Sequence, residues 1–491
     1  MTIVTALSLE KPVGKSELER HFLEPLVARV FGDYPDLDYV KDLRGGTLPP
    51  HIEVHEFFMK TGDYLGNLLA QQQYISTNDT FVARDMLVQG MNVIAQAVAQ
   101  RHEDGHWWLS LSSNPDIVAE LVERCTEAGQ PLLKVGVVNG QMPYMRGGAE
   151  VEPGFFDIVV TDLAATHHLF SPPNGKVSTA DYAIGLHASS LVVDGGTLQA
   201  CRVRSPLSTD DLEFLQRVGV FKPGTRLQGD TLVAADGMVV ANDLLSDSGL
   251  QAACTHLLGA RLTGGVFMTG GFVLGPNDFY ERLRNMPPQE LARIDMTRID
   301  FINQLYGRLP GEADLKRAQR RKARFMNTAM VVTLLGAAAS DALESGQVVA
   351  GVGGKNNFVA MAHAIPDARS ILMLRATHDN KDGLTSSIVF SYGNTTIPRH
   401  LRDIVITEYG VADLRGQGDS EVVKRLIGVV DSRFQPQLMA QARDPVELVQ
   451  MAIKSLWSGK QAPPEHLQRP GLDDATSFKD LFIRKLFAGD L

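Results

Sequence analysis

The stretch from Val349 to Phe358, VAGVGGKNNF, combines an apolar run with three closely spaced glycines and two asparagines. Gly351, Gly353 and Gly354 allow positive φ angles and leave backbone N–H groups accessible to a ligand. We therefore expect this loop to hold a ligand. The alternative is that the glycines make only a tight turn or a close packing contact. A nucleotide fingerprint is not supported, because no further glycine follows at the Rossmann spacing and no GxxxxGK[ST] precedes the loop.

A second candidate lies at the end of a later apolar run. The segment from Asp403 to Thr407 is followed by Glu408, Tyr409 and Gly410 and then by VADLRG, a pattern typical of a strand that ends in a polar turn. Ligands of open α/β sheets bind beyond the carboxyl ends of such strands. We therefore expect the residues after Thr407 to border a ligand site.

Other common chemical motifs are absent from the sequence. No HExxH, CxxC or DxDxDG pattern supplies metal ligands at a matched spacing, so we expect no metal site. No GxSxG string marks a nucleophilic serine, which argues against a serine hydrolase of the usual kind.

Composition places the chain among globular proteins. It has 491 residues, of which 44% are hydrophobic and 21% are charged, enough for two or three domains. The net charge of −10 argues against a phosphate-binding surface, so we expect no nucleic-acid partner. Cys125, Cys201 and Cys254 are far apart and odd in number, which favours a reducing compartment and a cytoplasmic protein. The N-terminus has no signal-peptide pattern and no apolar run reaches about 18 residues, so we expect no membrane segment.

The order of patterns predicts an α/β protein. Residues 1–105 are expected to form polar helices with core-facing apolar positions, as in ARDMLVQGMNVIAQAVAQRHE. From Trp107 onward, a strand, a helix and a second strand predict one βαβ unit of a parallel sheet, and Phe156 to Thr161 predicts a further strand. After the connector SPPNGK we expect a helix capped around residue 178 or 179, with Asp181 in its first turn. This connector is the expected domain boundary.

Four strings in the second half of the chain together resemble a known family. GVGGKNNFVAMA, SILMLRAT, NTTIPRH and ITEYGVADLRG, in this order and spacing, resemble the C-terminal half of the acetyl-CoA hydrolase/transferase family. The resemblance implies two similar open α/β halves with mostly parallel sheets and an active cleft between them. We place an N-terminal half with a helical start at residues 1–177 and a C-terminal half with a helical tail at residues 178–491.

The resemblance also implies a chemistry. In this family a glutamate attacks an acyl-CoA thioester and, through an anhydride, becomes a glutamyl-CoA thioester. Glycine-rich loops supply N–H groups to the oxyanion, and the loop at Gly351, Gly353 and Gly354 matches one of them. By the same resemblance Met330 falls at a CoA contact. Lys381 stands close to a lysine that faces the CoA phosphates, or is only a surface lysine in a Gly/Asp turn.

The sequence departs from the family on the N-terminal side of this site. The family glutamate precedes an Asp-Gly pair by four residues, but the string before Asp236 and Gly237 is RLQGDTLVAA, which holds no glutamate. The nearest acid, Asp230, is either a replacement nucleophile or the acid of an ordinary turn. A second glycine loop of the LGIG type is missing after Gln199.

We therefore expect an acyl-CoA transferase that moves CoA between a short-chain acyl-CoA and a carboxylic acid through an enzyme-carboxylate thioester. Two alternatives stay open. One is a hydrolase of short acyl-CoA, if water takes the acyl group; the other is a non-catalytic acyl-CoA-binding protein, because the glutamate and one glycine loop are missing. The resemblance implies acyl-CoA and a small carboxylic acid as ligands, no cofactor, and a homodimer. Asn357 and Ser387 replace charged residues of the family, which changes the charge near the site.

Overall fold

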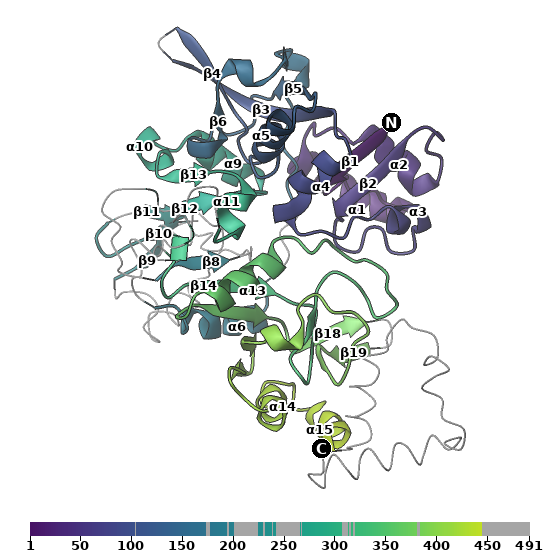
Figure 1. The fold of residues 1–491 in the computed structure, drawn as a ribbon, viewed down its shortest axis with the longest axis vertical. Coiled ribbons are helices and arrows are strands. Elements are labelled where there is room, and N and C mark those ends of the chain that lie inside the picture. Colours follow the sequence, from purple (N-terminus) through teal and green to yellow (C-terminus); the bar gives the residue numbers. More distant parts are fainter. Residues whose placement is uncertain are drawn as a thin grey trace. The chain divides into compact units, whose positions relative to one another are not determined.

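The structure is a computed structural model (Figure 1). It describes residues 1–443 except 104, 173–176, 194–195, 201–223, 229–230, 238, 242–265, 267, 307–312, 314–315, 318–319 and 381–382. Residues Met1–Leu438 form one compact unit and Met439–Leu491 a second. The site discussed below lies in the first unit.

The first large sheet has five strands in the order β6-β4-β3-β5-β7. Its strands are β3 (Val93–Glu103), β4 (His106–Ser110), β5 (Leu133–Val138), β6 (Glu150–Val151) and β7 (Ile158–Val160). β5 is parallel to β3 and β7, whereas β4 is antiparallel to β3 and β6. Helix α5 (Val118–Ala128) connects β4 to β5 and lies beside this sheet in Figure 1.

Two expectations about this part of the chain are wrong. The helical start is interrupted by strands, because β1 (Thr2–Ala6) pairs with β2 (Glu53–Phe58) and the second half of ARDMLVQGMNVIAQAVAQRHE forms β3. The helix ends at Val88, and from Val93 the chain pairs with strands on both sides, so tertiary pairing overrides the helical spacing. The three elements of the predicted βαβ unit are present as β4, α5 and β5. However, β3 lies between β4 and β5 in the sheet, and β4 runs antiparallel to β5.

The second large sheet has the order β22-β21-β17-β14-β8. Its strands are β8 (Leu198–Ala200), β14 (Arg324–Thr328), β17 (Arg369–Met373), β21 (Ile404–Thr407) and β22 (Gly410–Asp413). All neighbours are parallel except β22, which folds back on β21 as a hairpin. The strands predicted in SILMLRAT and before Glu408 are confirmed as β17 and β21, whereas the polar turn predicted after them contains the extra strand β22.

Two helices cover opposite faces of the second sheet. Met326 of β14 packs with Ile184 of α6 (Thr179–Ser189), whereas the neighbouring Phe325 packs with Phe358 of α13 (Lys355–Ala364). Successive side chains on a strand point to opposite faces of the sheet. Helices α6 and α13 therefore sandwich the parallel strands.

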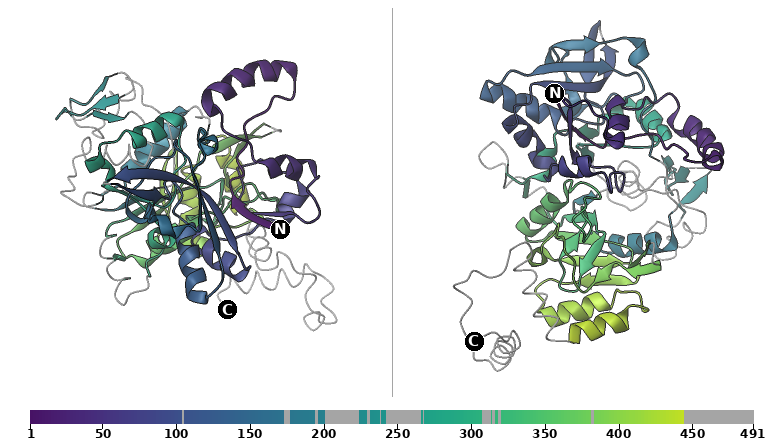
Figure 2. Two further views of the ribbon diagram at one scale, coloured as in Figure 1. Left: turned by 90° about the horizontal axis from the view of Figure 1, so that it is seen from above. Right: turned by 90° about the vertical axis from the view of Figure 1, so that its right-hand side faces the viewer.

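Shorter elements complete the described chain. The remaining strands pair as β9 (Arg226–Gln228), β10 (Thr231–Val233) and β11 (Val239–Ala241); β12 (Met268–Gly270) and β13 (Ile294–Met296); β15 (Val331–Thr333), β16 (Ala338–Ala339) and β20 (Ile388–Val389); and β18 (Thr377–Asn380) and β19 (Gly383–Ser386). The remaining helices are α1 (Glu17–Phe31), α2 (Asp38–Gly45), α3 (Leu68–Gln72), α4 (Val82–Val88), α9 (Asn277–Arg284), α10 (Pro288–Leu291), α11 (Ile299–Asn303), α14 (Asp419–Ile427) and α15 (Gln435–Arg443), and the 3-10 helix η1 (Asp79–Phe81) precedes α4. The cap predicted for α6 is confirmed, because Ser178 caps the helix and Asp181 completes a capping box. Figure 2 shows these elements from two further directions.

Helices and mostly parallel strands confirm the α/β fold class. Residues from far along the chain pack against the first sheet: Tyr280 and Met296 share one hydrophobic core with Val98 and Leu109. The domain boundary near residue 178 and the cleft between two halves stay predictions.

The glycine-rich loop packs against elements from the start of the chain. The side-chain amide of Gln71 donates to the carbonyl of Val348 at 2.9 Å and accepts its N–H at 2.7 Å. Phe58 lies against Gly351, so that a Cβ atom on that glycine would stand 2.8 Å from the Cα of Phe58 and closer still to its ring. The packing role that sequence analysis kept as an alternative is therefore confirmed for Gly351.

Replacing Gly351 with Ala should destabilise the first unit. The added methyl group meets the Phe58 main chain, which cannot move aside as a flexible side chain can, and such overpacking costs about 1–3 kcal/mol of unfolding free energy. Urea unfolding of the full chain measures this loss. The matched control is Gly185→Ala inside α6, where no atom lies within 4 Å of the new methyl group. That variant should be neutral or more stable by up to about 1 kcal/mol. Equal stability of the two variants would contradict the packing argument.

Candidate functional site

The parallel strands of the second sheet end together at what we call the carboxyl edge. β14 ends at Thr328, β17 at Met373 and β21 at Thr407. Helix α13 joins β14 to the parallel strand β17 and packs on both, so it runs antiparallel to them. Its first turn, after Gly354, therefore lies at the carboxyl edge, where open α/β sheets bind their ligands.

Four of the predicted binding residues belong to this edge. Met330 follows the end of β14 and is half-buried. Gly351, Gly353 and Gly354 lead into the first turn of α13. The predicted nucleophile Asp230 and the predicted phosphate contact Lys381 lie outside the described residues.

The position that corresponds to the family glutamate does lie within the described residues. Four residues before Asp236 stands Leu232 of β10, whose side chain is fully buried at 0% exposure. An aliphatic side chain neither attacks a carbonyl nor carries CoA. No acid takes the place of the glutamate at that point of the chain.

The loop before α13 presents main-chain N–H groups. Gly353 has a φ of +63°, a left-handed conformation that favours glycine. Gly354 is the N-cap of α13 and has no side chain. The N–H groups of the first turn therefore receive no hydrogen bond from an N-cap side chain. The start of a helix favours negative charge. This arrangement is compatible with an oxyanion or phosphate, and the ligand role of the loop stays a prediction.

Charged side chains follow the ends of β17 and β21. Arg375 donates two hydrogen bonds to Asp181 of α6, at 2.7 and 2.5 Å. Burial raises the pKa of Asp181, but hydrogen bonds from Arg375 and the helix cap outweigh it and the pKa is lowered. Glu408 accepts the N–H of Ala376 at 2.8 Å. The region predicted from the ITEYG string thus holds a carboxylate that is fixed to the neighbouring strand end.

The turn after β21 is fixed by side chains from a later segment. The hydroxyl of Tyr409 donates to Asp431 at 2.7 Å, and Arg433 donates to the same carboxylate at 2.8 and 2.7 Å. These bonds, from Arg433 first and then Tyr409, lower the pKa of Asp431. The hydroxyl of Thr407 donates to the carbonyl of Val429 at 2.7 Å. Hydrogen bonds made by the two neighbours of Glu408, Thr407 and Tyr409, therefore fix its position in the turn.

Sequence analysis missed two carboxyl groups beside the glycine loop. Asp79 opens η1 and donates its N–H to the carbonyl of Gly353 at 3.3 Å. Its Oδ2 lies 3.6 Å from the place where a Cβ on Gly353 would stand. Asp116 lies close enough to Asp79 for that charge to affect its pKa. Both acids follow polar turns, in STNDT and SSNPD, but no spacing in the sequence connects them with Gly353.

Both of these carboxyl groups have raised pKa values. Burial raises the pKa of Asp79 to about 6. Burial, and then repulsion by Asp79, raises the pKa of Asp116 to about 7. An ordinary aspartate is fully ionised at neutral pH, whereas these two titrate near it. Asp79 contacts the loop, and Asp116 interacts with Asp79.

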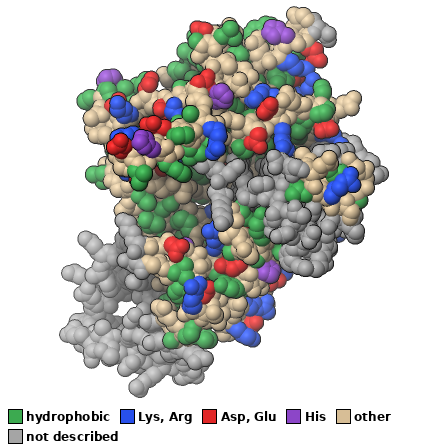
Figure 3. All heavy atoms as spheres, turned by 180° about the vertical axis from the view of Figure 1, so that it is seen from behind, with side chains coloured by type: hydrophobic (Ala, Val, Ile, Leu, Met, Phe, Trp, Pro, Cys, Tyr) green, Lys and Arg blue, Asp and Glu red, His purple; other side chains and the backbone are tan. Residues whose placement is uncertain are grey.

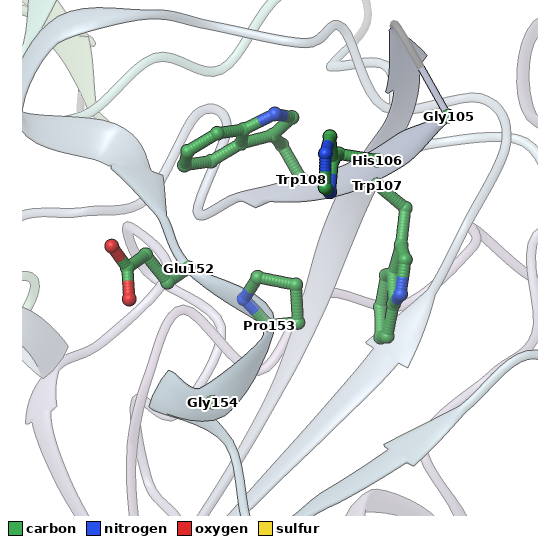
Figure 4. A pocket seen from close by; sticks show the side chains of 7 residues that line it. All are labelled: Gly105, His106, Trp107, Trp108, Glu152, Pro153 and Gly154. Carbon is green, nitrogen blue, oxygen red and sulfur yellow. The ribbon is translucent and has the colours of Figure 1, made fainter.

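An open hollow in the first unit involves none of these residues. It has a volume of about 410 Å³ and is lined by Gly105, His106, Trp107, Trp108, Glu152, Pro153 and Gly154 (Figure 4). The indole rings of Trp107 and Trp108 leave β4 on different sides, as expected for neighbours on a strand (Figure 4). Glu152 is the one carboxylate among the lining residues. The hollow offers no glycine loop and no paired ionisable groups.

The described residues contain neither a metal-binding cluster nor a membrane-spanning helix. None of the His, Cys, Asp and Glu side chains placed in the structure gather in a group of three that would hold a metal ion. No described helix is long and apolar enough to cross a membrane. On the face drawn in Figure 3, basic and acidic side chains are interspersed over the described surface.

Replacing Asp79 with Asn should stabilise the protein at high pH. The folded state raises the pKa of Asp79 to about 6 from 3.8, so it binds the proton more tightly than the unfolded chain does. The contribution of protonated Asp79 to the unfolding free energy is complete below about pH 4 and is lost as the pH rises through about 6. An amide of the same shape removes that loss, which is at most roughly 3 kcal/mol. We expect the melting temperature of Asp79→Asn to exceed that of the wild type by a few degrees at pH 8.

The difference should vanish at pH 3, where Asp79 is protonated in both the folded and the unfolded wild type. The control is Asp162→Asn, at an exposed residue that caps a short helix by accepting the N–H of Ala164 at 3.0 Å. Asparagine caps equally well, so this variant should show no gain at pH 8. A variant Asp79→Asn that is less stable than the wild type at both pH values would refute the burial argument.

Part of the chain matches a described family. Residues 275–442 match the acetyl-CoA hydrolase/transferase C-terminal domain. This range contains Met330, the glycine loop, helix α13 and Glu408. Of the four parallel strands of the second sheet, β14, β17 and β21 lie within this range and β8 lies before it.

Two curated relatives are named CoA transferases. The chain is 27% identical over 357 residues to the succinyl-CoA:cyclohexane-1-carboxylate CoA transferase of Geobacter metallireducens, which covers 72% of this chain and 71% of the relative. It is 22% identical over 312 residues to the 4-hydroxybutyrate coenzyme A transferase of Clostridium kluyveri, which covers 62% of this chain and 64% of the relative. The match to the second relative therefore spans less than two thirds of its length.

Two solved structures share the fold. RipA from Yersinia pestis superposes with a TM-score of 0.54 at 19% identity, over 80% of this chain and 81% of RipA. The 4-hydroxybutyrate CoA-transferase from Porphyromonas gingivalis superposes with a TM-score of 0.50 at 17% identity, over 90% of this chain and 93% of that one. The resemblance inferred from the four strings is confirmed by the family match and these relatives. Residues 275–442 are therefore similar to the acetyl-CoA hydrolase/transferase C-terminal domain, and the chain is similar to proteins named CoA transferases.

Proposed function

We propose that this chain moves CoA between a short-chain acyl-CoA and a carboxylic acid. One observation carries the proposal: the family match spans the whole carboxyl edge from Met330 through the glycine loop to Glu408. The names of the two curated relatives, both CoA transferases, support the same class of reaction. The acyl group and the acceptor acid are left unspecified.

The carboxyl edge has the features that such a reaction needs. Attack on a thioester places negative charge on the carbonyl oxygen, and preorganised N–H groups stabilise that charge. The loop from Gly351 to Gly354 and the uncapped start of α13 supply such groups. Met330, on the neighbouring strand end, is the proposed contact for CoA.

Transfer also needs an enzyme carboxylate. Its oxygen attacks the thioester carbon, the CoA thiolate leaves, and a mixed anhydride forms. The thiolate then attacks the enzyme carbonyl and releases the acyl carboxylate, so that CoA is held as an enzyme thioester. The acceptor acid runs the same steps in reverse. Asp230 is the nucleophile proposed from sequence.

Hydrolysis of acyl-CoA is the second candidate function. It is favoured by Leu232, which stands fully buried where the family carries its glutamate. Without an enzyme carboxylate, water is the remaining acceptor for the acyl group. A protein that binds acyl-CoA without turnover is the third candidate, for the same reason.

Incubation of the purified chain with acetyl-CoA and a panel of isotope-labelled short carboxylic acids tests the proposal. We expect labelled acyl-CoA to appear, because CoA passes to the acid through the enzyme. Mass spectrometry of the nucleotide pool measures this exchange, and thiol titration measures release of free CoA. Exchange should be at least about tenfold faster than release.

Other outcomes separate the three candidates. Release of free CoA at a rate independent of added acid would establish hydrolysis and contradict transfer. Tight binding of acyl-CoA in calorimetry, with neither exchange nor release, would establish a binding protein. A chain that neither binds nor turns over any short acyl-CoA would contradict the whole assignment.

A further inference from the structure

A carboxylate from the start of the chain faces the glycine loop. The N–H of Asp79 bonds the carbonyl of Gly353 at 3.3 Å, and the Asp79 Oδ2 lies 3.6 Å from where a Cβ on that glycine would stand. Gly353 has no side chain to cover the carboxylate. The loop expected to stabilise an oxyanion and a potential nucleophile are therefore direct neighbours.

Two arginines on or beside the elements that pack around Asp79 pair with other acids. Helices α4 and α11 pack against η1. Arg84 of α4 pairs with Asp85 at 2.7 Å. Arg298, just before α11, pairs with Glu123 and with Asp300. The charge of Asp79 raises the pKa values of two neighbouring ionisable groups, Asp116 and Tyr74.

Buried polar atoms without hydrogen-bond partners border the same place. The hydroxyl of Thr80, next to Asp79, belongs to a residue only 1% exposed, and the Oδ1 of Asn357 belongs to one 9% exposed. Neither atom has a partner among the described residues. Asn357 lies in the first turn of α13, directly after the loop, and helical side chains tilt toward the N-terminus of their helix. Buried polar groups require partners, and a ligand at the loop would supply one.

We propose that Asp79 is the enzyme carboxylate that attacks the acyl-CoA thioester and carries CoA, with Asp116 as a second carboxyl group that keeps its proton beside it. This inference rests on the transferase function proposed above. It assigns the nucleophile to a different element from the one that the sequence indicated.

The chemistry balances without a further reactant. An oxygen of ionised Asp79 attacks the thioester carbon, the C–S bond breaks, and CoA leaves as the thiolate. The thiolate attacks the Asp79 carboxyl carbon of the mixed anhydride, which releases the acyl carboxylate and leaves an aspartyl-CoA thioester. An acceptor carboxylate then attacks that thioester and reverses the sequence. Because no proton is consumed, Asp116 serves only to avoid a second negative charge beside the nucleophile.

The two pKa values agree with these roles. Burial raises the pKa of Asp79 to about 6, so this group is mostly ionised at pH 7. Burial and the Asp79 charge raise the pKa of Asp116 to about 7, so about half of the molecules keep that proton there. A raised pKa also makes a carboxylate a stronger nucleophile. The rate of thioester formation should therefore rise with pH, with a midpoint near 6.

Trapping of the thioester on the full wild-type chain tests the assignment. The chain is incubated with acetyl-CoA in the absence of an acceptor acid and then treated with borohydride, which reduces a thioester carbonyl to an alcohol, or with hydroxylamine, which captures it. Peptide mapping by mass spectrometry locates the modified carboxyl group. We expect it at Asp79. Modification of Asp230, Asp116, Glu408 or any other acid would overturn the assignment and leave the transferase function standing.

Variants provide the second arm of the test. Asp79→Asn should lose the adduct and at least about 100-fold of the exchange rate while still binding acetyl-CoA in calorimetry, because the loop is unchanged. The matched variant Asp162→Asn, at an exposed helix-capping acid outside the loop, should keep both. Exchange without any adduct, or an Asp79→Asn variant that exchanges at the wild-type rate, would also overturn the assignment. Absence of exchange in the wild type would remove it together with the transferase function.

Discussion

The close approach of Phe58 to Gly351 is the constraint on which the site depends. The two glycines at 351 and 353 carry no Cβ, so the loop before α13 can lie directly against residues from the start of the chain. Hydrogen bonds between Gln71 and Val348 hold the same segments together. A side chain at Gly351 would separate them and would move Asp79 away from the carboxyl edge. Packing and chemistry therefore use the same glycines, and the interpretations of the loop as a packing contact and as a ligand loop are compatible.

The same contact creates a conflict between stability and function. Asp79 and Asp116 are held next to each other and removed from water, which costs stability whenever both are ionised. By contrast, the partly buried carboxylate of Asp181 is paired with Arg375. Two neighbouring acids with raised pKa values are typical of a site at which charge is needed for chemistry. The features that make these residues unfavourable for folding are those that favour them as reactive groups.

Local patterns in the sequence predicted short apolar strands in both sheets, β4, β5 and β7 in the first and β17 and β21 in the second, but missed β3. Strands β17 and β21 are short apolar runs with polar ends, and the cap of α6 is marked by Ser178 and Asp181, so each is encoded by its own residues. Strand β3 carries spacing that also suits a helix, and only its pairing with β4 and β5 decides the outcome. The contact of Asp79 with Gly353 joins residues that are distant in the sequence, and no local pattern marks it. Sequence reasoning therefore found the loop but missed the acids that face it.

Amide hydrogen exchange of the full chain, with and without saturating acetyl-CoA, tests most directly whether the carboxyl edge is the CoA-thioester site. Main-chain N–H groups that bind a ligand exchange more slowly, so peptides covering Val349 to Phe358 and Thr407 to Gly410 should be protected at least about tenfold. Peptides that line the open hollow, from Gly105 to Trp108, should be unchanged and serve as the internal reference. Protection confined to the hollow, with the glycine loop exchanging at the same rate in both samples, would contradict the account.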